Sequence, residues 1–322
     1  MHLITGGNGF VGGAVLRRLM AEGISTLATV RKKPVDWPIQ QPVIEIGALT
    51  SNTDWSIALT GIQSVVHTAA RVHMMKDQAD DPLAEFRRVN VEGTLNLARQ
   101  AATAGVRRFV FLSSIKVNGE CTRVGIPFKA SDEPKPLDPY GISKWEAEVG
   151  LREISKNTGM EVVIIRPTLV YGPGVRGNFL SMMQWLHKGR PLPLGAIKNL
   201  RSFVAIDNLV DLIATCMHHP AAANQTFLVS DGEDISITEL LSKIAISMNK
   251  KAKLISIPKF LLFASAFILG KRKLSQRLID SLQVDIKKNQ QLLGWKPKVS
   301  LNIALLQTVK VFEETNRIVK TI

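Results

Sequence analysis

Short apolar stretches alternate with longer amphipathic ones over the first half of the chain. The apolar stretches are rich in Val, Ile, Leu and Phe, as expected of buried strands. They cover residues 2–4, 24–30, 43–46, 64–67, 108–112 and 162–165. Helical spacing lies between them, up to about residue 20 and over residues 82–104 and 139–156. This alternation predicts an α/β fold with a doubly wound parallel sheet.

The texture of the sequence changes after Pro167. Loops rich in Gly and Pro follow at 171–174 and 190–195, and short helices and turns are expected from there to the end. We expect one return to the sheet, at 226–230. The chain is therefore predicted to form a larger domain from residues 1–166 plus 201–231. A smaller C-terminal lobe, residues 167–200 plus 232–322, would pack over the carboxyl ends of the strands.

The net charge of +14 lies mostly in the last part of the chain. Residues 243–322 hold 16 Lys or Arg residues against four acids, a balance of +12. A lobe this basic suits an anionic partner, such as lipid, nucleic acid or a diphosphate. Nucleic acid is not expected, because the basic residues are neither interleaved with aromatic residues nor set in a known binding module.

The chain has only two cysteines, Cys121 and Cys216, and neither has a His or Cys partner at metal-ligand spacing. We therefore expect no disulfide framework and no metal site, in a reducing compartment. We also expect no signal peptide, and no apolar run is long enough to span a bilayer. The expected location is the cytoplasm, with contact at the inner face of the cytoplasmic membrane as an option.

A glycine-rich turn joins the first strand to the first helix. Gly6, Gly9 and Gly12 recur every three residues, and a helix is expected after them, through about Met20. Glycines let the backbone approach a pyrophosphate, whose charge is attracted by the helix N-terminus. The turn predicts a Rossmann-type, dinucleotide-binding domain. The alternative is a tight turn that binds nothing.

The second strand ends in three cations, Arg31, Lys32 and Lys33. An NAD enzyme places an acid here to bind the ribose hydroxyls, and an acid would repel a 2′-phosphate. A guanidinium can instead pair with that phosphate. Arg31 therefore favours NADP(H), with NAD(H) as the other option. The alternative is that the three cations form a solvated loop.

Tyr140 and Lys144 stand four residues apart in a stretch that Pro139 is suited to begin as a helix. A nearby ammonium favours the phenolate and lowers the pKa of a tyrosine. The pair can then exchange a proton with a carbonyl or hydroxyl. The same spacing also occurs on ordinary solvated helix faces.

Several short motifs follow one another in a fixed order along the chain. They are Thr5-Gly6-x-x-Gly9-x-x-Gly12, His67-x-Ala69-Ala70, Asn90-Val91-x-Gly93-Thr94, Ser113-Ser114, Tyr140-x-x-x-Lys144 and Arg166-Pro167. With these motifs the chain closely resembles the extended short-chain dehydrogenase/reductase family, in its nucleotide-sugar epimerase/dehydratase branch. The resemblance covers nearly the whole chain.

The resemblance implies a role for each matching residue. Ser114 would hydrogen-bond the reacting oxygen, Tyr140 would be the acid/base, and Asn90 would shape the active site. Lys144 would bind the nicotinamide ribose and lower the pKa of the tyrosine. The implied cofactor-binding residues are Gly6, Gly9, Phe10, Val11, Gly12, Arg31, Ala69, Ala70, Tyr140, Lys144 and Pro167. The implied substrate-binding residues are Ser114, Asn178 and Arg201, the last two on the substrate's diphosphate.

Three departures from the family pattern narrow the expected chemistry. Ile115-Lys116 replaces the Asp-Glu pair with which dehydratases eliminate water, so a 4,6-dehydratase is not expected. Ala48 stands where many relatives have an Asp for the adenine, and Asn118 replaces a Tyr. The run from Ser113 to Glu120 resembles a subgroup found in bacterial O-antigen and exopolysaccharide clusters, with members labelled 4-epimerases or 4-ketoreductases.

The cofactor decides between those two chemistries. An epimerase keeps its oxidised cofactor and usually selects NAD, whereas a net reductase exchanges cofactor at each turnover and uses NADPH. Arg31 therefore favours a 4-ketoreductase acting on a UDP-2-acetamido-2,6-dideoxy-4-hexulose for polysaccharide precursors. The alternatives are an NAD-dependent 4-epimerase of UDP-N-acetylglucosamine, of UDP-glucose or of a lipid-linked sugar, and a non-catalytic NADP-binding sensor. The sensor is disfavoured because Ser114, Tyr140 and Lys144 are all present.

Two assembly hypotheses complete the sequence analysis. By resemblance, the helices at 82–104 and 139–156 would form a four-helix interface of a homodimer, with Leu95 and Val149 contributing. The apolar run at 260–269, inside residues 258–273, is flanked by cations and could rest as a helix on an anionic membrane. The alternative is a core helix of the small lobe.

Overall fold

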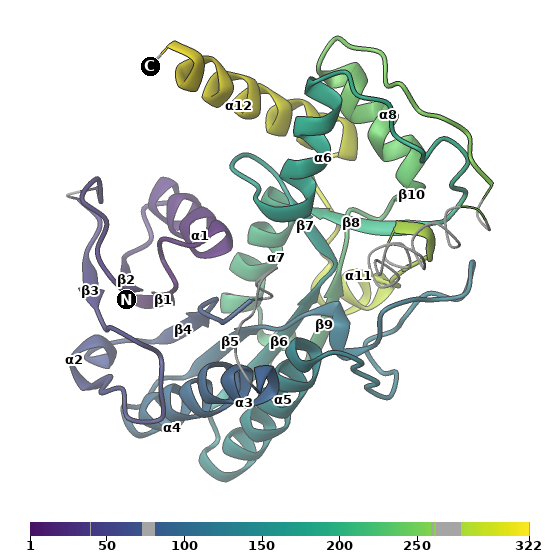
Figure 1. Ribbon diagram of the computed structural model, residues 1–322. Coiled ribbons are helices and arrows are strands. Elements are labelled where there is room, and N and C mark those ends of the chain that lie inside the picture. Colours follow the sequence, from purple (N-terminus) through teal and green to yellow (C-terminus); the bar gives the residue numbers. More distant parts are fainter. Residues whose placement is uncertain (39, 73–80, 259–260, 262–277, 322) are drawn as a thin grey trace.

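A computed structural model describes the chain except residues 39, 73–80, 259–260, 262–277 and 322 (Figure 1). Its centre is a seven-stranded sheet with the order β3-β2-β1-β4-β5-β6-β9, in which every neighbouring pair is parallel. The strands are β1 (His2–Thr5), β2 (Thr26–Val30), β3 (Val43–Glu45), β4 (Ser64–His67), β5 (Arg108–Leu112), β6 (Glu161–Pro167) and β9 (Thr226–Val229). The predicted doubly wound parallel sheet is confirmed, including the return of the chain at β9.

Helices cover both faces of this sheet. Figure 1 shows α1 (Phe10–Ala21) and α7 (Ile206–His218) on one face, and α4 (Thr94–Thr103) and α5 (Pro139–Thr158) on the other. Because successive side chains of a strand point to opposite faces, Ile4 packs with the first pair of helices and Leu3 with the second. Both faces of each central strand are thus buried, which explains why the strands are continuous apolar runs. The short helices α2 (Ser56–Leu59) and α11 (Lys287–Leu293) lie at the periphery of the sheet.

The single helix expected over residues 82–104 is interrupted. α3 (Pro82–Arg87) is followed by a π-helical segment, Arg88–Gly93, before α4 begins. A π-helical turn holds an extra residue and often marks a functional position. Here the segment contains Asn90, which is buried and faces α5 through a hydrogen bond from Nδ2 to Ser143 Oγ of 3.0 Å.

The small lobe has its own sheet and core. Its strands have the order β10 (Asp234–Ile235), β8 (Arg201–Ala205), β7 (Leu169–Tyr171), and its helices are α6 (Gly177–His187), α8 (Ile237–Ser247) and α12 (Leu301–Thr321). These helices share one apolar cluster. The expectation of short helices and turns is wrong for α12, which has 21 residues. β8 lies in the small sheet while α7 covers the large one, so residues 201–231 contribute to both units, and the division of the chain stays a prediction.

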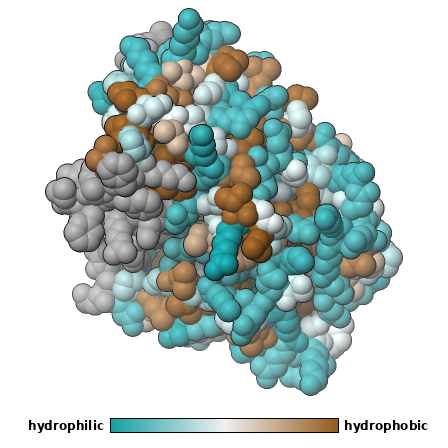
Figure 2. Space-filling model, turned by 90° about the vertical axis from the view of Figure 1, so that its right-hand side faces the viewer, coloured by the Kyte–Doolittle hydropathy of each residue, from teal (hydrophilic) through white to brown (hydrophobic). Residues whose placement is uncertain are grey.

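One face of the molecule is mixed in polarity. Figure 2 shows hydrophobic side chains in small groups among hydrophilic ones on the face it displays. Among the described residues, no helix is long and apolar enough to cross a membrane. Most of the segment 258–273 lies outside the described residues, so its expected membrane contact is not addressed by the structure.

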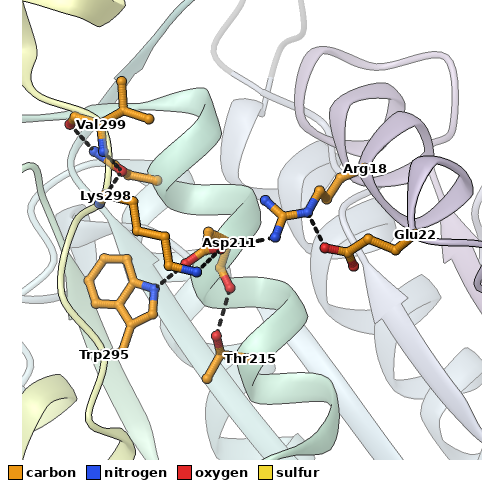
Figure 3. Close-up of polar contacts among 8 residues, drawn as sticks. Arg18, Glu22, Asp211, Thr215, Trp295, Lys298 and Val299 are labelled. Atoms are coloured by element: carbon orange, nitrogen blue, oxygen red, sulfur yellow. Dashed lines mark hydrogen bonds and ion pairs between the residues drawn. The ribbon is translucent and has the colours of Figure 1, made fainter.

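A polar cluster joins the last part of the chain to the large domain (Figure 3). Asp211 of α7 accepts hydrogen bonds from Trp295 Nε1 and Lys298 Nζ, both at 2.8 Å, and from Arg18 of α1 at 3.2 Å. Burial opposes the charge on Asp211, yet the hydrogen bonds and the two cations leave its pKa below the ordinary value. Gly294 ends α11 with a φ of 63°, and Trp295, the next residue, is buried.

Candidate active site

The glycine turn after β1 leaves no room for side chains. A Cβ added at Gly12 would lie 2.3 Å from the carbonyl oxygen of Gly6, and one at Gly6 would lie 3.0 Å from the backbone of Ala69. Gly6 also has a φ of 69°, which favours glycine. Gly9 precedes α1 and supplies no side-chain cap, so the first amide groups of this 12-residue helix have no side-chain acceptor at the cap. This cradle fits the pyrophosphate of a dinucleotide.

The next strand is tied to the turn by a buried histidine. His67 Nδ1 lies 2.7 Å from Thr5 Oγ1, and its Nε2 lies 2.9 Å from Thr94 Oγ1 on α4. Burial and the charge of Lys144 lower the pKa of His67 to about 3. The imidazole is therefore neutral, and it acts as a rigid link between β1, β4 and α4. Its place in the motif with Ala69 and Ala70 was visible in the sequence, but its two hydroxyl partners were not.

Tyr140 and Lys144 lie in the first turns of α5. Asp138 caps this helix by accepting a 2.7 Å hydrogen bond from the Gly141 amide. Lys144 is buried, and its Nζ donates to the carbonyl oxygen of Leu112 at 2.8 Å. The same Nζ lies 4.4 Å from the centre of the Phe111 ring. Burial lowers the pKa of Lys144 to about 7, although Glu148 opposes this shift.

The environment of Tyr140 differs from the expectation. Burial and the carboxylate of Asp138 raise the pKa of its phenol, whereas the sequence predicted that Lys144 would lower it. The reason is geometric, because the ammonium of Lys144 is held against the end of β5 by Leu112. Lys116, which forms an ion pair with Asp138, lies 5.9 Å from the centre of the tyrosine ring.

The two adjacent serines at the end of β5 have different surroundings. Ser113 is buried, and its hydroxyl donates to Glu148 Oε1 at 2.6 Å. Ser114 is only partly buried, and its Oγ accepts a hydrogen bond of 3.3 Å from the Lys116 amide. Ser114 is therefore the serine whose hydroxyl remains accessible at the carboxyl end of the sheet.

Beneath these serines lies a buried ion pair that the motifs did not reveal. Arg166 at the end of β6 donates two hydrogen bonds to Glu148, of 2.9 and 2.6 Å, and a third, of 2.9 Å, to Asn118 Oδ1. The side chain of Glu148 is 0% exposed and that of Arg166 is 2% exposed. The sequence signalled Arg166 through the Arg166-Pro167 motif and Glu148 through its place one turn after Lys144, but nothing in it paired the two. The pair fixes the ends of β5 and β6 and the middle of α5 to one another.

Other expected site residues lie around this centre. Asn90 Oδ1 accepts a 2.8 Å hydrogen bond from the Arg71 amide, next to Ala69 and Ala70. Pro167 ends β6, opposite Val229 of β9. Arg31 is exposed directly after β2, at the same carboxyl edge of the sheet as the glycine turn.

The two residues of the small lobe that are expected to bind the substrate's diphosphate have no described contact with Tyr140. Asn178 is exposed in the first turn of α6. Arg201 begins β8 and donates from Nη1 to the carbonyl oxygen of Asp280 at 2.9 Å. In the part of the chain that the structure describes, no group of three His, Cys, Asp or Glu residues could hold a metal ion.

The arrangement brings a glycine turn, an accessible serine and a Tyr–Lys pair to one edge of the sheet. Comparison with known proteins finds relatives over most of the chain. A UDP-glucose 4-epimerase from Vibrio cholerae is 45% identical over 315 residues, which cover 98% of this chain and 96% of the relative. An undecaprenol-linked sugar epimerase from Escherichia coli O157:H7, N-acetyl-alpha-D-glucosaminyl-diphospho-ditrans,octacis-undecaprenol 4-epimerase, is 30% identical over 80% of this chain and 75% of its own length.

The fold is also shared with solved structures. The UDP-glucuronic acid 4-epimerase of Bacillus cereus, crystallised with NAD, superposes with a TM-score of 0.79 at 22% identity, over 98% of this chain and 99% of that structure. The family model for the NAD dependent epimerase/dehydratase family matches residues 2–230. The protein therefore belongs to the NAD dependent epimerase/dehydratase family.

Proposed function

We propose that the protein is a nucleotide-sugar 4-epimerase that retains NAD during turnover. The observation that carries this proposal is the 45% identity over nearly the full length with an enzyme that is a 4-epimerase. The presence of Ser114, Tyr140 and Lys144 at the carboxyl edge of the sheet supports a catalytic protein over a sensor. This ranking reverses the one that Arg31 alone suggested.

The residues of the crevice suit this chemistry. A bound nicotinamide dinucleotide would accept a hydride from carbon 4 of the sugar and return it to the opposite face. Tyr140 would take the proton of the 4-hydroxyl group and give it back, while Ser114 Oγ would hydrogen-bond the same oxygen. The glycine turn would hold the pyrophosphate, and Lys144 would bind the nicotinamide ribose.

Tyr140 needs help to act as a base. Burial and Asp138 keep its phenol protonated in the free protein. Positive charge brought into the crevice would favour the phenolate. We propose that a bound oxidised cofactor would supply this charge, while Lys144 binds its ribose and Lys116 screens the carboxylate of Asp138.

The proposed substrate is a UDP-sugar, either UDP-N-acetylglucosamine or UDP-glucose. Asn178 and Arg201 would hold its diphosphate, and Arg201 offers the forked guanidinium that suits phosphate. A lipid-linked substrate is the alternative that the Escherichia coli relative suggests. A homodimer through α3–α5 is also proposed, since Val149 of α5 is exposed, whereas Leu95 of α4 packs against Gly150 within its own chain.

A second candidate function is an NADPH-dependent 4-ketoreductase. It is favoured by Arg31, which is exposed directly after β2 and could there pair with the 2′-phosphate of NADP(H). Under this alternative, wild-type protein should prefer NADPH over NADH by about 1.5–3 kcal/mol, and Arg31→Asp should reverse the preference. Equal binding of both cofactors by the wild type would count against the reductase.

The deciding experiment uses the purified full chain. The protein is mixed with UDP-N-acetylglucosamine or UDP-glucose without added cofactor, and the sugar is analysed by NMR. In parallel it is mixed with NADPH and a UDP-linked 4-keto-6-deoxy sugar. An epimerase forms the 4-epimer in the first reaction and leaves NADPH unchanged in the second. Consumption of NADPH without any epimerisation would identify the reductase.

A further inference from the structure

Two adjacent segments of the small lobe carry several cations and no acid. We name the segments 185–198 and 246–258 the basic surface. They contain Lys188, Arg190, Lys198, Lys250, Lys251 and Lys253, and neither segment contains an Asp or Glu. All six cations are exposed. Soluble surfaces ordinarily intersperse both signs of charge, so two adjacent segments without an acid stand out.

Backbone and side-chain contacts hold the two segments together. The Leu192 amide donates to the carbonyl oxygen of Lys253 at 2.9 Å, and the Ile255 amide donates to that of Leu192 at 2.8 Å. Lys250 Nζ donates to the carbonyl oxygen of His187 at 2.6 Å. The cations are therefore displayed by one ordered surface.

Large apolar side chains lie among these cations. Trp185 is 45% exposed, Ile255 51% and Ile246 70%. The guanidinium of Arg190 lies 5.5 Å from the centre of the Trp185 ring. Tryptophan and aliphatic side chains beside Lys and Arg are the composition of surfaces that rest at a membrane interface.

Acids on the adjoining elements are few and set to the sides. Glu239 lies at the opposite end of α8 from Lys250. Glu313 and Glu314 follow Phe312 on α12, whose ring contacts His187. In the described residues of α6, α8 and α12 these three carboxylates do not balance six cations, so the surface keeps a positive potential that attracts anionic lipid.

We propose that the basic surface is a docking site for an anionic lipid bilayer. The occupant is a membrane rather than nucleic acid, because the exposed apolar residues are aliphatic as well as aromatic and match an interface better than a stack of bases. The inference goes beyond the proposed epimerase activity and does not depend on it. It would place the enzyme beside membrane-bound donors or acceptors of its sugar.

The test is flotation of the purified full chain with two kinds of vesicle. One contains phosphatidylglycerol and phosphatidylcholine in equal parts, and the other contains phosphatidylcholine alone. Wild-type protein is expected to float with the anionic vesicles at low salt and to be released at high salt. The triple variant Lys250→Gln, Lys251→Gln, Lys253→Gln should bind about a hundredfold more weakly, as the loss of three interfacial cations implies.

A matched variant controls for net charge. The control variant replaces three exposed cations with Gln: Arg99 of α4, Arg107 in the turn before β5 and Lys156 of α5. This variant should float like the wild type. Circular dichroism confirms that both variants fold. The proposal is overturned if the wild type stays at the bottom of the gradient, or if the first triple variant floats as well as the control. Binding of a single-stranded oligonucleotide by the wild type, without binding of anionic vesicles, would identify the other class of partner.

Discussion

Two carboxylates in this protein each meet two cations, but in different surroundings. Glu148, in the large domain, pairs with Arg166 and with Arg152, whose side chains are 2% and 41% exposed. Asp211, at the junction with the C-terminal segment, pairs with Arg18 and Lys298, which are 38% and 66% exposed (Figure 3). The side chains of Glu148 and Asp211 are 0% and 6% exposed, so the contrast lies in the cations: both partners of Asp211 are open to water, whereas Arg166 is shielded from it.

The difference separates two uses of an ion pair. Around Asp211 the exposed cations link α1, α7 and the segment after α11, and each ion pair contributes little to stability. Around Glu148 the pair lies directly under Ser113 and next to Lys144, and it holds the strand ends that carry the proposed chemistry. The region under the proposed site should therefore be destabilised strongly by the loss of one charge partner, whereas the outer junction should be destabilised little. The predictions below test this contrast, from the largest expected effect to the smallest.

The largest effect should come from Tyr140, which lies on the same helix as Glu148. Tyr140→Phe removes the proton donor with almost no change in volume, so turnover should fall by about 2 to 4 powers of ten while the protein stays folded. The chain has one other tyrosine, Tyr171, which is buried and donates to Asp231. Tyr171→Phe is the matched control and should keep most of the activity. Equal activity of the Tyr140→Phe variant and the wild type would remove Tyr140 from the mechanism.

The buried ion pair should show its effect in stability. Glu148→Gln leaves the guanidinium of Arg166 buried without a charge partner, and unfolding in urea should show a loss of about 3–5 kcal/mol. In the double variant Glu148→Gln, Arg166→Met the buried guanidinium is gone and only the half-exposed Arg152 loses a partner, so part of that loss should be recovered. A single variant as stable as the wild type would mean that water reaches Arg166.

Acid should weaken the fold through His67. Its pKa is about 3 in the folded protein and 6.5 in its ordinary state, so the unfolded chain takes up a proton that the fold excludes. The corresponding stability is present above pH 6.5 and is lost as the pH falls toward 3. Between pH 7 and 4 the loss is on the order of 3 kcal/mol. Urea unfolding at several pH values should show that the free energy of unfolding falls less steeply with falling pH for His67→Gln than for the wild type. Equal pH dependence in the two proteins would exclude His67 as the cause.

The outer junction should give the smallest effect. Lys298→Gln removes one of the two cations of Asp211, but the hydrogen bond from Trp295 and the ion pair with Arg18 remain. The free energy of unfolding should change by about 1 kcal/mol or less, and less again at high salt. A loss as large as that of Glu148→Gln would abolish the contrast between the two clusters.

Local features of the sequence predicted the framework well. The apolar runs form the strands because both faces of a parallel sheet are buried. The glycine turn needs glycine because a Cβ at its positions would clash with neighbouring atoms. The Asn90 segment was expected to be an ordinary helix, and its π-helical turn could not be foreseen because it depends on the partners of one side chain.

Properties set by tertiary contacts were harder to predict. The spacing of Tyr140 and Lys144 suggested a lowered pKa for the tyrosine, but burial and Asp138 act in the opposite direction. The pairing of Glu148 with Arg166 joins residues 18 positions apart, on a helix and a strand, and no short motif contains both. The length of α12 was also missed, since its apolar face is defined by the small lobe that it packs against.

The central claim is that the crevice around Ser114, Tyr140 and Lys144 inverts carbon 4 of a UDP-sugar with its cofactor retained. The most direct measurement uses UDP-glucose and UDP-N-acetylglucosamine carrying deuterium at carbon 4, incubated with wild-type protein and no added cofactor. The account predicts that the 4-epimer of at least one sugar forms with its deuterium still at carbon 4, as NMR would detect. Recovery of both sugars unchanged, or an epimer that has lost its deuterium to solvent, would contradict it.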